Sequence, residues 1–221
     1  MSKIVTTTPV KIGNTFRTEF TIIRLLDKRM VSSKVEFTAE LAIHDDATAE
    51  EQIRVLSGMR KWFDVVLDGS IAFCPANDIS QTTFEELDND LMLCPDDPYD
   101  HILLALIVAK INAIGSDTMY SLHSHLVSDL GEGFGNYLEG DPDGILPSLT
   151  EWLGPVTYFD KPWWHRSDGS MIDLAVGEGM DPNEKPDILI DLYDNMHIIV
   201  EGREPAEIIK PNFTPTIVRN D

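Results

Sequence analysis

Two stretches near the start of the chain alternate between apolar and polar residues. They span residues 16–26 and 34–43, and every second residue from Val35 to Leu41 is apolar. A period of two places these apolar side chains on one face of a β-strand. Because the connection at residues 27–33 is short and polar, the sequence predicts an antiparallel hairpin with one buried face.

The pattern then changes to a helical period. Thr48 and Glu51 have the spacing of a capping box, in which each side chain bonds to the other residue's backbone. Apolar residues recur three or four positions apart over residues 53–67, which predicts an amphipathic helix. The pair Asp68 and Gly69 is typical of a helix C-terminus, so we expect the helix to end there.

A second helix is predicted over residues 97–115, with Asp97 as the N-cap residue and Pro98 in the first helical position. Residues 102–114 are apolar on nearly every face, so this helix must be buried on all sides. The residues expected at the centre of the core are Ile102, Leu103, Leu104, Leu106 and Ile107.

The rest of the chain has mostly strand-like patterns. Residues 119–127 alternate again, and strand-like stretches in residues 156–203 are separated by turn residues such as those at 167–170. We therefore predict an α+β fold. An antiparallel sheet would pack on two main helices and be followed by a β-hairpin-rich C-terminal part with extended terminal arms.

This pattern divides the chain into four parts. They are an N-terminal arm (1–13), an α+β core (14–155), a β-hairpin region packed on the core (156–203) and a C-terminal arm (204–221). Neither arm has a periodic apolar face, yet both contain apolar residues, among them Phe213. Such arms gain most by lying along the strand edge of a neighbouring subunit, which predicts self-assembly.

The charge of the chain, formally −21, is concentrated in one region. Residues 62–160 contain 18 Asp and Glu against a single basic residue, Lys110, whereas residues 1–61 are nearly balanced. This distribution argues against binding of nucleic acid, anionic membranes or phosphate ligands, and it favours cations and basic protein surfaces. The candidate contacts for a basic surface are Asp96, Asp97 and Asp100.

The cysteine content and the hydropathy pattern indicate the compartment. Cys74 and Cys94 are the only cysteines, too few for a disulfide framework. The longest strictly apolar run, residues 102–109, is shorter than the roughly 20 residues that cross a bilayer. We expect a soluble, cytoplasmic protein, located in the host cytoplasm or the virion if the protein is viral.

Four residues are weak candidates for a zinc site. His123 and His125 are two positions apart, so on a strand they share one face and could chelate a metal ion. Cys74 and Cys94 are separated by far more than the two to four residues of a zinc knuckle. Two buried cysteines and a polar strand face account for the same pattern. We expect no cofactor. Weak binding of a divalent cation by the acidic clusters is a further possibility that the sequence leaves open.

Trp163 and Trp164 form the strongest candidate for an interaction hot spot. If these residues lie in a strand, their side chains face opposite ways. One indole would then be in the core, and the other would be exposed or at an interface. Burial of both indoles by the chain's own tail is an equally weighted alternative, because tryptophan is usually well buried.

The expected order of elements over residues 14–139 is strand, strand, helix, helix, strand, strand, which resembles that of tunnelling-fold pterin enzymes. The resemblance implies a metal-dependent enzyme that uses His123 and His125. However, this His-x-His pair follows the helices, and the first strand has no partner histidine.

The leading hypothesis is a non-enzymatic, acidic assembly or interaction protein. Arm exchange of the predicted kind is frequent in virus particles, so a bacteriophage structural or accessory component is the expected context. Two alternatives stay open: an acidic decoy that occupies the basic groove of a DNA-binding protein, and the metal-dependent enzyme.

Overall fold

The computed structural model describes residues 12–77, 89–131, 134–137, 145–177, 180–181 and 183–193. Its strands are β1 (Ile12–Leu26), β2 (Arg29–Ile43), β3 (Ile71–Phe73), β4 (Leu91–Leu93), β5 (Met119–Ser128) and β6 (Phe134–Tyr137). Its α-helices are α1 (Ala49–Lys61), α2 (Asp100–Gly115) and α3 (Leu149–Leu153). Within these residues no helix is long and apolar enough to cross a membrane.

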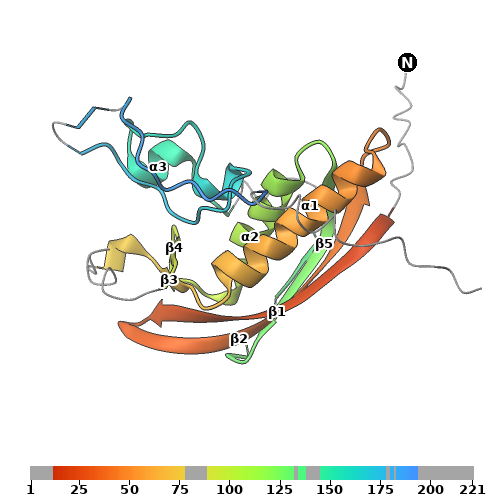
Figure 1. Ribbon diagram of the computed structural model, residues 1–221. Helices are drawn as coiled ribbons and strands as arrows, with labels where there is room; N and C mark the ends of the chain where they lie inside the picture. The colour runs from red at the N-terminus through yellow and green to blue at the C-terminus, as the bar shows by residue number, and fades with distance from the viewer. Residues whose placement is uncertain are drawn as a thin grey trace, which may run out of the picture.

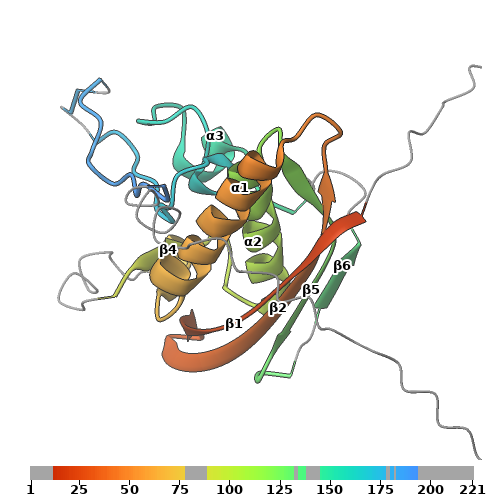
Figure 2. The same ribbon diagram turned by 45° about the vertical axis from the view of Figure 1, so that its right-hand side comes forward.

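The strands form one six-stranded sheet in the order β4-β3-β1-β2-β5-β6. The sheet curves around α2, and α1 and α2 lie on its concave side (Figures 1 and 2). The predicted α+β class is confirmed. The sheet is mixed, however: β1, β2, β5 and β6 pair antiparallel, whereas β3 runs parallel to β1 and to β4.

The hairpin of β1 and β2 is longer than predicted. Its turn consists of Asp27 and Lys28 alone, which have φ values of 48° and 63°. Two positive-φ residues match the twist of a two-residue hairpin, so the ladder begins at once with Leu26 opposite Arg29. The expectation that residues 27–33 connect the strands is therefore wrong.

Helix α1 follows its predicted boundaries. The Glu51 N–H donates to the Thr48 hydroxyl at 3.2 Å, and the Thr48 N–H donates to the Glu51 carboxylate at 2.8 Å, which confirms the capping box. The hydrogen bonds that the Glu51 carboxylate accepts from the Thr48 N–H and the Thr48 hydroxyl hold its pKa below the usual value. The helix continues as a π-helical turn, η1 (Trp62–Leu67), and Gly69 ends it with a φ of 79°.

Helix α2 begins two residues later than predicted. The Tyr99 N–H donates to the Asp97 carbonyl at 2.7 Å, so residues 97–99 form a turn, and Tyr99 is the N-cap residue. The C-terminus at Gly115 and the burial of the helix are confirmed. The five predicted core residues, all at most 4% exposed, are Ile102, Leu103, Leu104, Leu106 and Ile107.

The two main helices are separated by β3 and β4, so the order of elements that resembled the tunnelling fold is wrong. The largely apolar run at residues 70–74 predicts a short buried strand, and β3 confirms it. Strand β4 has three residues, too few for a period of two to be recognised in the sequence.

The predicted hairpins of residues 156–193 are also absent from the part of this segment that the structure describes. Residues 156–177 contain a single isolated bridge, between Thr157 and Ala175, and a 3-10 turn, η5 (Trp163–His165). Residues 188–193 form no strand. The expected strand at residues 197–200 and both arms, apart from the first residues of β1, lie outside the described residues.

Candidate functional site

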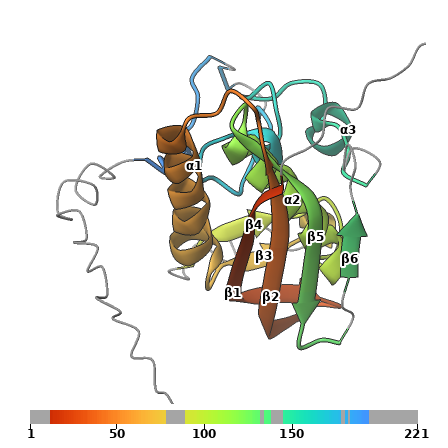
Figure 3. The same ribbon diagram turned by 90° about the vertical axis from the view of Figure 1, so that its right-hand side faces the viewer.

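Strand β1 has a neighbour on both sides over only a short part of its length. On one side, β2 pairs with it from Ile12 to Leu26. On the other side, β3 pairs with it only at Ile23 and Arg24. Among the described residues, the stretch 12–20 of β1 is therefore an edge of the sheet, which we call the open edge (Figure 3).

Thr21 shows which backbone groups point outward from the open edge. Its N–H donates to the Asp68 carboxylate at 2.7 Å, and its carbonyl accepts from the Gly69 N–H at 2.7 Å. Thr21 thus directs both groups away from β2, and the direction alternates along a strand. The outward N–H and carbonyl groups of the open edge belong to Thr15, Arg17 and Glu19.

Among the described residues, these outward groups have few hydrogen-bond partners. The Arg60 guanidinium donates to the Arg17 carbonyl at 3.4 Å. Within the described part of the chain, no other hydrogen bond is formed by the outward backbone groups of Thr15, Arg17 and Glu19. An unpaired strand edge is a template for another strand, and natural sheets usually block such edges.

The side chains beside the open edge carry both signs of charge. Arg17 lies 3.3 Å from Glu36, and Lys34 lies 2.7 Å from Glu19. The hydrogen bond from Lys34 lowers the pKa of Glu19. Because all four side chains are exposed, these ion pairs contribute little to stability. The mixture of charges does not repel a strand of similar sequence.

The open edge is rigid because its other face belongs to the core. Phe16 and Phe20 are buried against Phe63, with ring centroids 5.3 and 5.7 Å apart. The Arg60 guanidinium lies 4.9 Å from the centre of the Phe16 ring. A partner strand would thus meet a backbone that is already held in the extended conformation.

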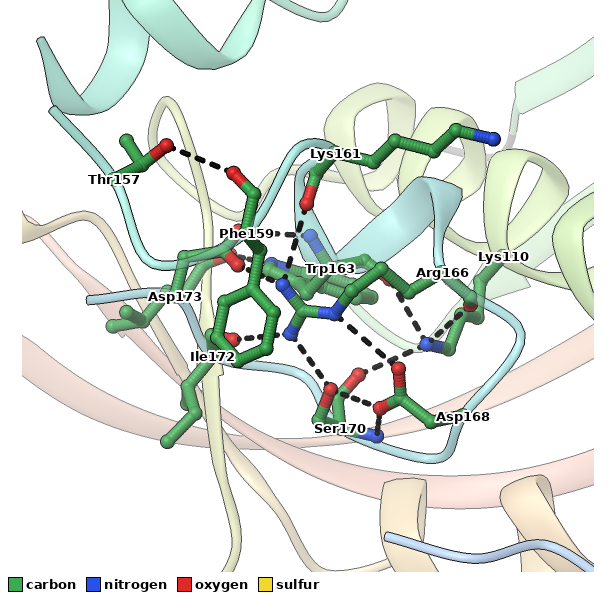
Figure 4. Close-up of polar contacts among 11 residues, drawn as sticks. Lys110, Thr157, Phe159, Lys161, Trp163, Arg166, Asp168, Ser170, Ile172 and Asp173 are labelled. Atoms are coloured by element: carbon green, nitrogen blue, oxygen red, sulfur yellow. Dashed lines mark hydrogen bonds and ion pairs between the residues drawn. The ribbon is translucent and has the colours of Figure 1, made fainter. Parts of the chain in front are cut away.

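A cluster of buried polar contacts, which we call the clasp, ties residues 157–176 to α2 (Figure 4). The Lys110 ammonium donates to the carbonyls of Trp163, Arg166 and Ser170 at 2.9, 2.9 and 3.0 Å. An ammonium has three hydrogens, so all of them are used. Burial lowers the pKa of Lys110 to about 7.

Arg166 forms the other half of the clasp. Its guanidinium pairs with Asp173 and Asp168, and it donates to the Ser170 hydroxyl at 2.8 Å and the Ile172 carbonyl at 2.9 Å. Burial raises the pKa of Asp173, and the positive charge of Arg166 opposes this effect. Since these groups bind each other, the clasp is a structural element.

A pocket borders the clasp. Its polar lining residues are Asn89, Asp90 and Ser170, and the others are apolar. The Asn89 amide donates to the Gly69 carbonyl at 2.8 Å, and the Ser170 hydroxyl donates to Asp168. Among the described residues of this lining there is no nucleophile–base pair of the kind that hydrolysis requires.

Both tryptophans of the predicted hot spot are fully buried, so the expectation that one would be exposed is wrong. They lie in a 3-10 turn instead of a strand, so their side chains do not face opposite ways. The Trp163 indole N–H donates to the Leu93 carbonyl at 2.8 Å, and the Trp164 ring packs 4.8 Å from the Trp152 ring.

The acidic candidates are in different environments. Asp96 is exposed and Asp97 half-buried, but Asp100 is buried. The Asp100 carboxylate accepts from the Arg24 guanidinium at 2.6 Å and from the Ser128 hydroxyl at 2.8 Å. Asp100 is thus unable to contact a basic surface, which corrects that prediction for this residue. Phe213 lies outside the described residues.

The candidate zinc ligands are not brought together. His123 and His125 lie on the exposed face of β5, and β1 and β2 separate that strand from β3 and β4. Cys74 and Cys94 follow β3 and β4 and are buried, and this burial raises the pKa of both thiols. Among the described residues, no group of three or more His, Cys, Asp and Glu could hold a metal ion.

No protein-family model and no curated protein sequence matches this chain. Neither the open edge nor the clasp was predicted from the sequence. The open edge depends on the shortness of β3, and the clasp joins residues that are 53 to 60 positions apart.

Proposed function

We propose that this protein is a non-enzymatic assembly or interaction protein that binds its partner by adding a strand to the open edge of β1. The observation that supports the proposal is the run of outward backbone groups at Thr15, Arg17 and Glu19, backed by a rigid aromatic core. In strand addition, backbone hydrogen bonds supply affinity and alternate side chains supply specificity.

The charge and the composition of the chain agree with this proposal. A net charge of −21 disfavours nucleic acid as a partner, and the open edge lies in residues 1–61, where the charges are nearly balanced. Each backbone hydrogen bond across a new strand pair contributes about 0.5–1.5 kcal/mol net. Homo-oligomers and bacteriophage structural or accessory components are the setting that we propose for such pairing.

A proline at position 17 tests the proposal. Arg17→Pro removes an N–H that points away from β2, so the β1–β2 ladder of one subunit keeps its hydrogen bonds. We expect this variant to lose assembly in native mass spectrometry and sedimentation velocity while its circular dichroism stays that of the parent. Arg17→Ala is the matched control, because it removes the same side chain but keeps the N–H.

The result is decided by the pair of variants. Loss of assembly in Arg17→Pro but not in Arg17→Ala supports strand addition. A parent protein that is monomeric at high concentration and binds no partner would contradict the proposal, as would an Arg17→Pro variant that assembles like the parent.

A further inference from the structure

We infer that the strand that pairs with the open edge is the same edge of a second copy, with the two β1 strands antiparallel about a twofold axis at Phe16. This inference rests on the proposed function and names its partner. A symmetric interface of this kind uses one surface twice and closes on itself as a dimer. It would join two six-stranded sheets into one and remove the open edge from both copies.

The length of the open edge favours the axis at Phe16. The edge begins with β1 at Ile12 and ends before Thr21, whose outward groups are occupied by Asp68 and Gly69. With the axis at Phe16, Asn14 of one copy lies opposite the second copy's Thr18, within the part of β1 that pairs regularly with β2. The regular part of both open edges is then used, and neither strand meets the turn at Asp68 and Gly69.

Neighbouring registers fit less well. Since the outward groups belong to odd-numbered residues, each odd-numbered residue must lie opposite an odd-numbered residue of the other copy, so the axis can move only in steps of one residue. An axis at Arg17 places two Arg17 side chains opposite each other, and like charges in this position are destabilising. An axis at Thr18 places Thr15 opposite Thr21, whose outward groups are already occupied. An axis at Thr15 places Glu19 and Phe20 opposite residues that precede the partner's β1.

In the Phe16 register, Thr15 of each copy lies opposite Arg17 of the other. Such a pair exchanges both N–H···O bonds, and the Arg17 carbonyl has a second lone pair for Arg60. On the inner face the two Phe16 rings approach each other beside the Phe63 rings, which adds an aromatic contact at the axis.

Cysteine cross-linking tests the register. Thr15→Cys and Arg17→Cys are prepared separately, and each is oxidised with oxidised glutathione, alone and mixed with the other. Opposite residues have Cα atoms about 5.5 Å apart, within disulfide range, whereas diagonal neighbours are about 7–8 Å apart. We expect the mixture to form covalent dimers at least several-fold faster than either variant alone. The native cysteines, Cys74 and Cys94, are buried and give little background.

Deletion of residues 1–11 distinguishes the inferred partner from the N-terminal arm. We expect the truncated protein to remain a dimer and to cross-link as the full chain does. Loss of the dimer on truncation would show that the arm of a second copy fills the edge, and this would overturn the inference. Faster cross-linking of Arg17→Cys alone would overturn it too, because it places the axis at Arg17.

These outcomes separate the inference from the proposed function. If Arg17→Pro abolishes assembly but the cysteine mixture does not cross-link, strand addition stands and the second copy's β1 is the wrong partner. If Arg17→Pro assembles like the parent, the proposed function itself is wrong.

Discussion

The β1–β2 hairpin and the segment of residues 157–176 are held in place by different physical means. In the hairpin, two 15-residue strands share a long backbone ladder, regular from Asn14 to Leu26 of β1, and alternate side chains enter the core. In residues 157–176, the backbone has a single isolated bridge, and its carbonyls are bound by the side chains of Lys110 and Arg166.

This difference determines where stability is concentrated. The hairpin distributes its free energy over many similar contacts, so no single surface residue is essential. The clasp concentrates its free energy in two cations whose removal leaves buried groups without partners. A buried polar or charged group without a partner lowers the free energy of unfolding by far more than the loss of an average contact does.

The largest effect is expected for Arg166→Ala. The Asp173 side chain is 1% exposed, so the substitution leaves a buried carboxylate without its cation. Breaking a buried pair in this way costs about 3–5 kcal/mol. We expect urea unfolding to show a loss of this size and hydrogen exchange to rise most in residues 157–176.

Lys161→Ala is the control for this measurement, since Lys161 lies in the same segment with an exposed side chain. If Arg166→Ala matched Lys161→Ala in both measurements, the clasp would not hold the segment, and the contrast with the hairpin would disappear.

Leu104→Ala should be nearly as destabilising, but it should lower the stability of the whole domain instead of one segment. Leu104 is 2% exposed on the buried helix α2, and leucine-to-alanine changes in cores cost about 2–5 kcal/mol through lost burial and the remaining cavity. We expect thermal melting to show a lower midpoint with one transition. Ile53→Ala, at a residue that is 60% exposed, is the control and should change little. A parental melting curve for Leu104→Ala would place α2 outside the core.

A smaller effect, dependent on pH, is expected from Lys110. Its pKa falls from the ordinary value of 10.5 to about 7 because burial disfavours the charged form. Between these two values the unfolded chain binds a proton that the folded chain does not, so stability rises with pH. The slope is at most about 1.4 kcal/mol per pH unit for one group.

Below pH 7 Lys110 is charged in both the folded and the unfolded chain. The folded protein then bears the full free-energy cost of burying that charge. Urea unfolding from pH 7 to 10 measures the slope, and Lys110→Met provides the comparison because it cannot titrate. Tyr193 and the two cysteines have raised pKa values and contribute the opposite slope, which both proteins share. Equal slopes in both proteins would show that Lys110 keeps its proton throughout.

The sequence predicts the elements whose signals are local. The alternation around Val35 to Leu41, the capping box of Thr48 and Glu51, and the apolar surface of α2 each depend on residues within a few positions of one another, and all are confirmed. The capping box can be recognised in the sequence because the hydrogen bonds of Thr48 are formed inside the first helical turn.

The clasp and the open edge have no local signal. Trp163 and Trp164 have a composition typical of a strand, but Lys110 binds the backbone around them and replaces the ladder that a strand would form. Asp100 was expected on the surface because nothing near it in sequence indicates Arg24, 76 positions away. The open edge likewise follows from the three-residue length of β3, which is set by tertiary packing.

The smallest effect is expected at the surface of the hairpin. The side chains of Arg17 and Glu36 are 67% and 50% exposed, so Arg17→Ala should change the free energy of subunit unfolding by only about 0–1 kcal/mol. Salt screens exposed charges over about 10 Å at 0.1 M, so the difference should shrink further at high ionic strength. Urea unfolding at low and high salt measures both, with Lys34→Ala as a matched variant that breaks the neighbouring pair with Glu19. A loss of more than about 2 kcal/mol, well above the range of exposed pairs, would mean that the hairpin depends on one contact as the clasp does.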